Sequence, residues 1–364
     1  MVTLSEPQHS SGEREEPTGR LPDLNITDAY NDQNSTNETQ CIDLNYWDWL
    51  NRHQPVYLFI ITALGIVLNV FVLLVFCLHK KACMVAKIYL NNLAAAHLLL
   101  VSYLPFWAVD IQKHFNWPFG EALCKVVNAG IRMTAYCSIY FLVLVSMDRY
   151  LALVHPMSHG QMRTPKYAKL GCLLVWGLGL LLSASTLIFR AVKYLPKFDA
   201  RACISAHPNQ MVELVCDGML ITFGFIISIS IIAFCTITII RALKKQSLAR
   251  SNAQKSEQKA TTLMLVVLVA FLICWGPYHF ITAINVLHDT NILVGCALEN
   301  VLAILTQIFA CLACSNSVVN PILYVIVGKN FRKKVQEVCK QYAVSPVTTA
   351  STRSNTSATL KTFT

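Results

Sequence analysis

The chain has 364 residues, of which 54% are hydrophobic and only 14% are charged, and its mean hydropathy is +0.47. This is far more apolar surface than one soluble core of that size would hide, so the composition predicts a polytopic membrane protein. A formal net charge of +10 would suggest a nucleic-acid partner in a soluble protein. Here the lysines and arginines lie in short segments between apolar runs, which argues against nucleic acid.

The start of the chain has the composition of an extracellular tail. Its first 40 residues are polar, lack an apolar run and predict a disordered segment without a cleavable signal peptide. Asn25, Asn34 and Asn37 each begin an Asn-X-Ser/Thr sequence, the acceptor for N-linked glycans. Three such sequences within fifteen residues favour a lumenal or extracellular side. We therefore assign residues 1–52 to a glycosylated extracellular tail.

Seven apolar stretches follow, each long enough to cross a bilayer as a helix. They cover residues 55–78, 88–109, 126–147, 170–189, 218–240, 260–284 and 300–328. Only helices satisfy the backbone hydrogen bonds of such spans, so the predicted fold class is all-α, an integral membrane bundle of seven transmembrane helices over residues 53–328. Lysine and arginine cluster after the first, third, fifth and seventh spans, which predicts that these segments are cytoplasmic and the N-terminus is extracellular.

The residues after the last span predict a short amphipathic helix on the membrane surface, over 329–342. Phe331, Val335, Val338 and Cys339 recur there at helical spacing, between basic residues. Cys339 is either a palmitoylation site or a plain membrane-facing cysteine. Residues 343–364 are rich in serine and threonine and predict a disordered cytoplasmic tail that gains charge by phosphorylation.

Four cysteines fall on the predicted extracellular side. Cys124 opens the third span and Cys203 lies between the fourth and fifth, so the two form a natural disulfide in an oxidising compartment. Cys41 precedes the first span and Cys296 precedes the seventh, and a second bridge there would rim the outer mouth. Four cysteines allow three pairings, so spacing alone leaves the connectivity open.

Several short motifs on these spans are typical of one family. They are Asn69, Leu93-Ala94-Ala95-Ala96, Asp148-Arg149-Tyr150, Trp176, Cys274-Trp275-Gly276-Pro277, Asn316-Ser317 and Asn320-Pro321-Ile322-Leu323-Tyr324. Because each occurs on the expected span in the expected order, residues 41–342 resemble the rhodopsin-like (class A) G-protein-coupled receptors. Within that family, residues 104–108, 115–120, 123–128 and 148–157 resemble the bradykinin (kinin) receptors. The basic residue Arg132 makes the likeness closer to the subtype that prefers peptides lacking the terminal arginine.

The resemblance implies a switch at the cytoplasmic end of the bundle. Asp148 would hold Arg149 in the inactive state and release it for the carboxyl-terminal helix of a G protein, whereas the alternative is a snorkelling arginine at the membrane interface. Pro277 and Pro321 remove backbone hydrogen bonds and make pivots, and Trp275 couples the ligand to one of them. The residues assigned to the switch are Asp148, Arg149, Tyr150, Asn320, Pro321 and Tyr324.

At the extracellular end the resemblance implies a peptide site and the Cys41–Cys296 bridge. Arg132 lies two turns below Cys124, and its guanidinium suits the C-terminal carboxylate of a peptide without the terminal arginine. The alternative is an intramolecular salt bridge. The residues assigned to ligand binding are Trp107, Asn128, Arg132, Arg190, Trp275, Tyr278, Thr282, Asn285, Glu299 and Gln307.

Some residues depart from the pattern that the resemblance implies. His97 replaces the expected aspartate of the second span, in a sodium pocket lined by His97, Ser138, Asn316, Ser317 and Asn320. Without that carboxylate we expect no sodium effect on agonist affinity. Ser185 stands where a proline is expected in the fourth span. Ser228 replaces the proline expected in the fifth span, which softens a kink used in activation. Asn285 and Ala303 stand where two acids are expected to meet the cationic N-terminus of a peptide. Glu299, helped by Glu213, remains to bind that N-terminus.

The sequence therefore predicts a plasma-membrane receptor for a kinin-like extracellular peptide. By resemblance it activates heterotrimeric G proteins of the phospholipase C and calcium branch, and its phosphorylated tail recruits a receptor kinase and arrestin. Membrane lipid is a further partner, and we expect no cofactor, no metal and no nucleic acid.

The alternatives are a receptor of the same fold with a different ligand or a weakly coupling, scavenging role, and a transporter or channel. The last predicts inverted repeats and acidic groups at mid-membrane, which the sequence lacks. No metal-ligand spacing or nucleophile motif supports an enzyme.

Overall fold

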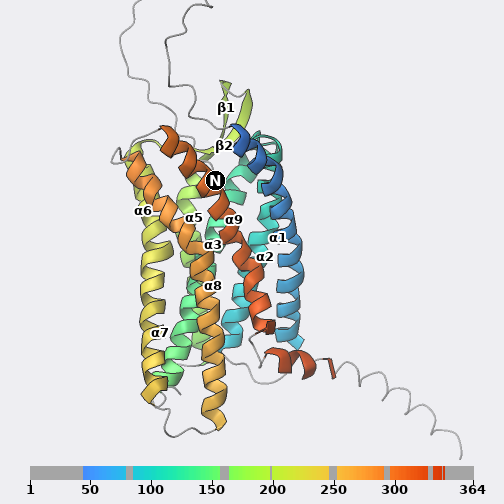
Figure 1. Ribbon diagram of the computed structural model, residues 1–364, viewed down its shortest axis with the longest axis vertical. Helices are drawn as coiled ribbons and strands as arrows, with labels where there is room; N and C mark the ends of the chain where they lie inside the picture. The colour runs from blue at the N-terminus through green and yellow to red at the C-terminus, as the bar shows by residue number, and fades with distance from the viewer. Residues whose placement is uncertain are drawn as a thin grey trace, which may run out of the picture.

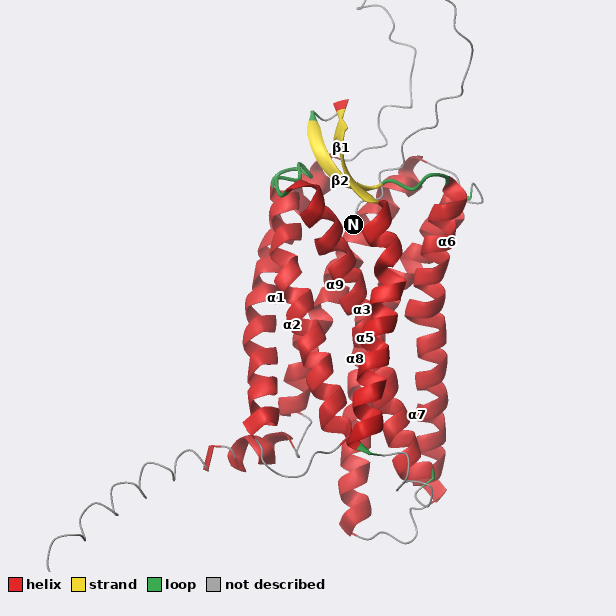
Figure 2. Ribbon diagram, turned by 180° about the vertical axis from the view of Figure 1, so that it is seen from behind, coloured by secondary structure: helices red, strands yellow, loops and turns green. Residues whose placement is uncertain are grey.

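The computed structural model describes residues 44–78, 85–155, 164–196, 199–245, 252–290, 296–326, 331–337 and 339–340. Long helices run side by side along one axis, and a two-stranded hairpin projects from one end of the bundle (Figures 1 and 2). The helices are α1 (Leu44–Leu78), α2 (Val85–Gln112), α3 (Gly120–Val154), α5 (Pro165–Phe189), α6 (Gln210–Ile221), α7 (Ile227–Lys245), α8 (Asn252–Asp289) and α9 (Cys296–Ile326). We call the end that carries the hairpin the hairpin end.

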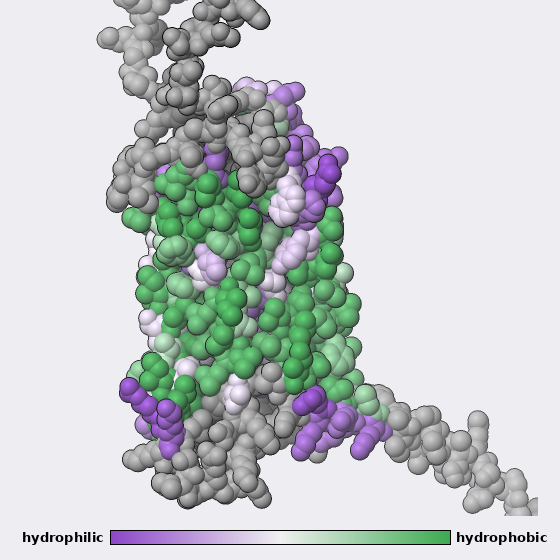
Figure 3. Space-filling model, viewed as in Figure 1, coloured by the Kyte–Doolittle hydropathy of each residue, from purple (hydrophilic) through white to green (hydrophobic). Residues whose placement is uncertain are grey.

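The predicted class, an all-α bundle that spans a membrane, is confirmed. Seven stretches of the described residues are long and apolar enough to cross a bilayer: Asp48–Leu78, Val85–Gln112, Gly120–Val154, Pro165–Phe189, Gln210–Ala242, Leu265–His288 and Asn300–Ile326. On the face of the molecule in Figure 3, apolar residues cover the middle of the bundle. On α5, Leu173 and Leu181 leave 69% and 70% of their surface exposed, which in water would invite aggregation but suits lipid.

Most helices extend beyond the apolar stretches from which they were predicted. The third span was expected over 126–147, but α3 begins at Gly120 and ends at Val154. The fifth span begins at Gln210 rather than 218 and is built from α6, a π-helical turn (Thr222–Ile226) and α7 in succession. Hydropathy marks the part of a helix that lies in hydrocarbon, whereas backbone hydrogen bonds continue into its polar ends.

The hairpin was not predicted. Strand β1 (Arg190–Leu195) pairs antiparallel with β2 (Ala200–Ser205), in a register that places Arg190 opposite Ser205 and Val192 opposite Cys203. A disulfide between Cys203 of β2 and Cys124 of α3 ties the hairpin to the bundle. This confirms the predicted Cys124–Cys203 bridge, and it fixes β2 over the hairpin end of α3.

The helices are held together by close packing and by buried hydrogen bonds, because apolar side chains gain little by leaving lipid. A Cβ atom added to Gly179 of α5 would lie 2.6 Å from Sγ of Cys137 on α3, so the two backbones approach closely there. The amide of Asn69 donates to the carbonyl of Ser317 at 2.9 Å and joins α1 to α9. The indole of Trp176 donates to Asn92 at 3.0 Å and joins α5 to α2.

A π-helical turn distorts the fifth span directly before Ile227 and Ser228. The carbonyl of Phe223, inside this turn, accepts hydrogen bonds from Tyr140 Oη at 2.9 Å and from Ser228 Oγ at 3.1 Å. Such turns interrupt the regular helix without a proline. The serine that stands at the proline position therefore contributes a hydrogen bond to an irregularity of the same helix.

Residues 331–337 form a short helix across the end of the bundle opposite the hairpin (Figures 1 and 2). Phe331 is buried in edge contacts with Phe71 and Phe76 at 6.2 and 5.5 Å between ring centroids. Lys334 Nζ lies 5.0 Å from the ring of Phe76, and its pKa is lowered, first by burial and then by Lys87. The short predicted helix is thus anchored on α1 by its aromatic residue, and Cys339 beyond it is exposed.

Candidate functional site

An open cavity of about 710 Å³ lies at the hairpin end of the bundle. It is lined by Arg132, Ser185, Thr186, Phe189, Arg190, Ser205, His207, Glu213, Asp217, Leu220, Tyr278, Thr282, Asn285 and Thr306. These residues come from α3, α5, the hairpin, the segment between β2 and α6, and from α6, α8 and α9. We call it the main cavity. Its mixture of aromatic, neutral polar and charged groups suits an organic ligand with charged ends.

Two arginines make one part of the main cavity cationic. Arg132 comes from α3, and Arg190 is the first residue of β1. Arg190 is 3% exposed, and its Nη1 donates to the carbonyl of Cys203 at 3.2 Å, while its buried Nε has no partner. Burial, and then the charge of Arg132, lower the pKa of Arg190 to about 10. Arg190 therefore stays cationic at neutral pH, and the pair is suited to bind an anion.

Acidic and neutral polar side chains complete the cavity. Glu213 and Asp217 come from α6, and Oε1 of Glu213 lies 3.7 Å from Nδ1 of His207. On the other wall, the amide of Asn285 donates to Thr306 Oγ1 at 3.1 Å, which links α8 to α9. The cavity therefore offers both signs of charge to a ligand.

A second cavity, of about 540 Å³, adjoins α2, α3 and the hairpin. We call it the α2 cavity. Its lining is Trp107, Asp110, Phe115, Trp117, Val127, Asn128, Ile131, Arg190, Ala202, Cys203 and Ile204. Asn128 donates to Sγ of Cys203 at 3.3 Å. Arg190 lines both cavities, so the structure brings the predicted residues Trp107 and Asn128 to one side of it and Arg132, Tyr278, Thr282 and Asn285 to the other.

The remaining predicted ligand residues lie elsewhere. Gln307 is 1% exposed and accepts a hydrogen bond from Gln54 at 3.0 Å, between α1 and α9, outside both cavity linings. The side chain of Glu299 is outside the described residues. Trp275 lies deeper and contacts the rings of Tyr278 and His279 at 6.1 and 5.9 Å. Tyr278 faces the main cavity, so it connects that cavity to Trp275.

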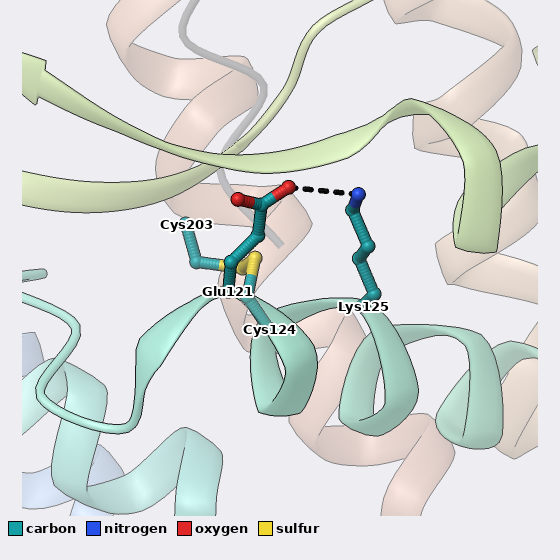
Figure 4. Close-up of polar contacts among 4 residues, drawn as sticks. All are labelled: Glu121, Cys124, Lys125 and Cys203. Carbon is teal, nitrogen blue, oxygen red and sulfur yellow. Dashed lines mark ion pairs between the residues drawn. A yellow bond between two sulfur atoms is a disulfide. The ribbon is translucent and has the colours of Figure 1, made fainter.

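The hairpin end of α3 is fixed by covalent and ionic contacts. Cys124 and Cys203 are bridged with their Cα atoms 5.8 Å apart, and Glu121 pairs with Lys125 at 2.7 Å one turn away (Figure 4). Cys41 and the side chain of Cys296 lie outside the described residues, so that pairing stays a prediction. The acceptors Asn25, Asn34 and Asn37 also lie outside them.

The opposite end of α3 carries the predicted switch residues. Nη2 of Arg149 lies 3.1 Å from Oδ2 of Asp148, and both side chains are buried. Tyr150 Oη is 3.1 Å from Nε2 of His155. On α9, Asn320, Pro321 and Tyr324 are buried at the same end of the chain's last span. The guanidinium of Arg149 is thus within ion-pair distance of its neighbouring carboxylate, and the role of these residues as a switch stays a prediction.

A group of neutral polar side chains occupies the middle of the bundle. His97 and Asn320 are buried, and neither His97 Nε2 nor the amide atoms of Asn320 have a hydrogen-bond partner. Ser138 donates to the carbonyl of Thr134 at 2.8 Å. Asn316 Oδ1 and Ser317 Oγ are also buried without partners. Within the described residues, no group of three or more histidines, cysteines or acids could hold a metal ion.

Comparisons with known proteins fit this geometry. A profile of the 7 transmembrane receptor (rhodopsin family) matches residues 68–324. The B2 bradykinin receptor of Homo sapiens is 46% identical over 303 residues, which cover 83% of this chain and 78% of that receptor. The chain belongs to the bradykinin receptor family. The B2 bradykinin receptor of Rattus norvegicus is also 46% identical over 303 residues, covering 83% and 76%, and the B1 bradykinin receptor of Homo sapiens is 38% identical over 297 residues, covering 81% and 84%.

The predicted family is therefore confirmed, and the chain is a multi-pass membrane receptor of that family. The human B2 receptor shares more identical residues with the chain than the human B1 receptor does. The expected likeness to the subtype for peptides without the terminal arginine was based on Arg132. The identity over the whole chain is higher to the human B2 receptor, whereas the subtype prediction depends on the single residue Arg132.

Two acids of the cavities were missed from the sequence. Asp110 directly follows the expected second span, which ended at 109, and Asp217 directly precedes the expected fifth span, which began at 218. Both helices continue past those limits, so the two acids lie inside the cavities rather than in loops. The signal that could have identified both residues is an acidic side chain directly next to an apolar run.

Proposed function

We propose that the chain is a plasma-membrane receptor for an extracellular kinin-like peptide, and that it activates heterotrimeric G proteins of the phospholipase C and calcium branch. The observation that carries the proposal is the main cavity, where Arg132 and buried Arg190 stand with Glu213 and Asp217 above Trp275. Relatives named bradykinin receptors support the peptide class. The basic segments between the helices support an extracellular hairpin end.

In this proposal the peptide enters C-terminus first. Its carboxylate binds between Arg132 and Arg190, and its cationic N-terminus remains near Glu213, Asp217 and Glu299. A charge-assisted hydrogen bond of this kind contributes about 1.5–3 kcal/mol. Occupancy moves Tyr278 against Trp275, beside the pivot Pro277. Opening of the other end releases Arg149 from Asp148 for the G protein.

Several partners and modifications belong to the same proposal. Asn25, Asn34 and Asn37 carry glycans, and Cys41 pairs with Cys296. The short helix lies on membrane lipid, with Cys339 palmitoylated. The phosphorylated tail recruits arrestin after a receptor kinase acts on it. The exposed position of Cys339 supports its modification.

Calcium release tests the proposal in cells that express the receptor at the surface. A kinin that ends in arginine and the same peptide without that arginine are each titrated on the wild type and on Arg132→Ser. We expect the wild type to release calcium in response to the peptides. In Arg132→Ser, the ratio of the two potencies shifts by roughly tenfold or more in favour of the peptide that ends in arginine. Lys125→Ser is the matched control, since it removes the same charge from α3 at a residue paired with Glu121 outside the cavities. Unchanged selectivity in Arg132→Ser would contradict the assigned role.

A further inference from the structure

The α2 cavity contains a carboxylate that the proposed peptide contacts leave unused. Asp110 of α2 lines this cavity with the rings of Trp107, Phe115 and Trp117. Its Oδ1 atom is buried and has no hydrogen-bond partner. A buried acceptor that makes no bond is costly, so such a group calls for a partner that the protein alone does not supply.

Arg190, the cation on the same cavity wall, does not meet that need. No ion pair within 4.0 Å joins any lysine, arginine or histidine of the described residues to Asp110. The Nη1 atom of Arg190 is instead held by the carbonyl of Cys203 at 3.2 Å. The lining of the α2 cavity therefore includes a carboxylate and a guanidinium that are not paired with each other.

The position of Arg190 on both cavity linings connects the two sites. A peptide carboxylate that binds Arg190 from the main cavity places the side chain of its own residue beside the α2 cavity. The partner that fits both groups at once is a residue with a carboxylate and a cationic side chain, which is a C-terminal arginine or lysine.

We infer that Asp110 is a specificity-determining residue, which binds the basic side chain of a C-terminal residue and makes the α2 cavity its subsite. The inference rests on the proposed function, because it assumes a peptide whose carboxylate binds Arg190. A guanidinium matches a carboxylate in a planar, two-point contact, and the rings of Trp107 and Trp117 add cation–π attraction. Asp110 thus favours peptides that keep a basic C-terminal residue, whereas Arg132 favours peptides without it.

The test is a cycle of two receptors and two peptides. One kinin ends in arginine and the other ends in citrulline, which has nearly the same shape but no charge. Competition binding is measured on the wild type and on Asp110→Asn. We expect the wild type to bind the arginine peptide about tenfold or more tightly than the citrulline peptide, and the ratio to fall to about twofold in the variant. The affinity for the citrulline peptide stays the same.

Two controls separate the subsite from other effects. Glu121→Gln removes a carboxylate of the same charge from the surface of α3 and preserves the tenfold ratio. Asp110→Ser repeats the measurement with a smaller neutral side chain, and surface expression of each variant is quantified with an antibody tag. If Asp110 only positions Arg190, both peptides weaken equally and the ratio stays, which overturns the inference.

An unchanged ratio in both Asp110 variants, with binding intact, overturns the subsite but leaves the peptide receptor standing. Failure of the expressed wild type to bind either peptide overturns the proposed function, and the subsite with it. Loss of the ratio in Glu121→Gln as well assigns the selectivity to long-range charge rather than to Asp110, and also overturns the inference.

Discussion

Replacing His97 with aspartate tests how the middle of the bundle departs from its family. His97 is 1% exposed on α2, which packs against α3 and α9. On α9, Asn316, Ser317 and Asn320 each have a buried polar atom without a partner. His97→Asp adds a negative charge to this neutral, buried region. It therefore creates the anionic group that a sodium ion requires.

The burial of His97 sets the size of the effect. A carboxylate at the centre of a transmembrane helix costs about 2.5–3.5 kcal/mol, so the variant is destabilised by a similar amount when no cation binds. A bound cation restores RT ln(1 + [Na⁺]/Kd), which is about 2.7 kcal/mol at a concentration of 100 times Kd. We expect sodium to raise the Tm of His97→Asp and to lower its agonist affinity about fivefold or more. The wild type changes in neither quantity.

The assay compares sodium chloride with the chloride of a bulky organic cation at equal ionic strength. Tm is measured on the receptor in detergent, and agonist affinity is measured in membranes. His97→Asn is the matched control, because it removes the imidazole without adding charge and so gains no response to sodium. A sodium effect in the wild type, or a folded His97→Asp receptor that ignores sodium, would refute the reasoning.

Three further substitutions test separate parts of the structure. Arg149→Ala removes the proposed G-protein contact, so calcium release is lost while peptide affinity in membranes is retained; loss of both would contradict the switch. Tyr140→Phe removes the 2.9 Å bond to the Phe223 carbonyl and lowers the free energy of unfolding by about 0.6 kcal/mol, checked by denaturation in detergent. Cys203→Ala opens a bridge across 79 residues, costs about 2–4 kcal/mol and weakens peptide binding because β2 is no longer fixed to α3; an unchanged Tm would count against the hairpin's role.

The spans and the family could be predicted from the sequence because both signals are local. Burial in lipid acts on each residue by itself, so apolar runs mark the helices wherever they pack. Motifs such as Asp148-Arg149-Tyr150 are contiguous, and the Arg149–Asp148 contact needs only neighbouring residues. The Cys124–Cys203 bridge could be inferred because few cysteines fall on one side of the membrane.

The features that were missed depend on contacts between distant segments. The hairpin forms from residues with no strong alternation, and its position depends on the bridge to α3. The π-helical turn depends on donors from Tyr140 and Ser228, which the fifth span alone does not reveal. Asp110 and Asp217 belong to the cavities only because their helices extend past the apolar runs.

The most direct test of the central claim is nucleotide exchange on a purified G protein of the calcium branch, catalysed by the purified receptor in lipid. With kinin peptide added, we expect exchange that rises with peptide concentration, saturates, and disappears in Arg149→Ala while that variant still binds the peptide. A folded wild-type receptor that binds no kinin, or binds it without accelerating exchange, would contradict the account.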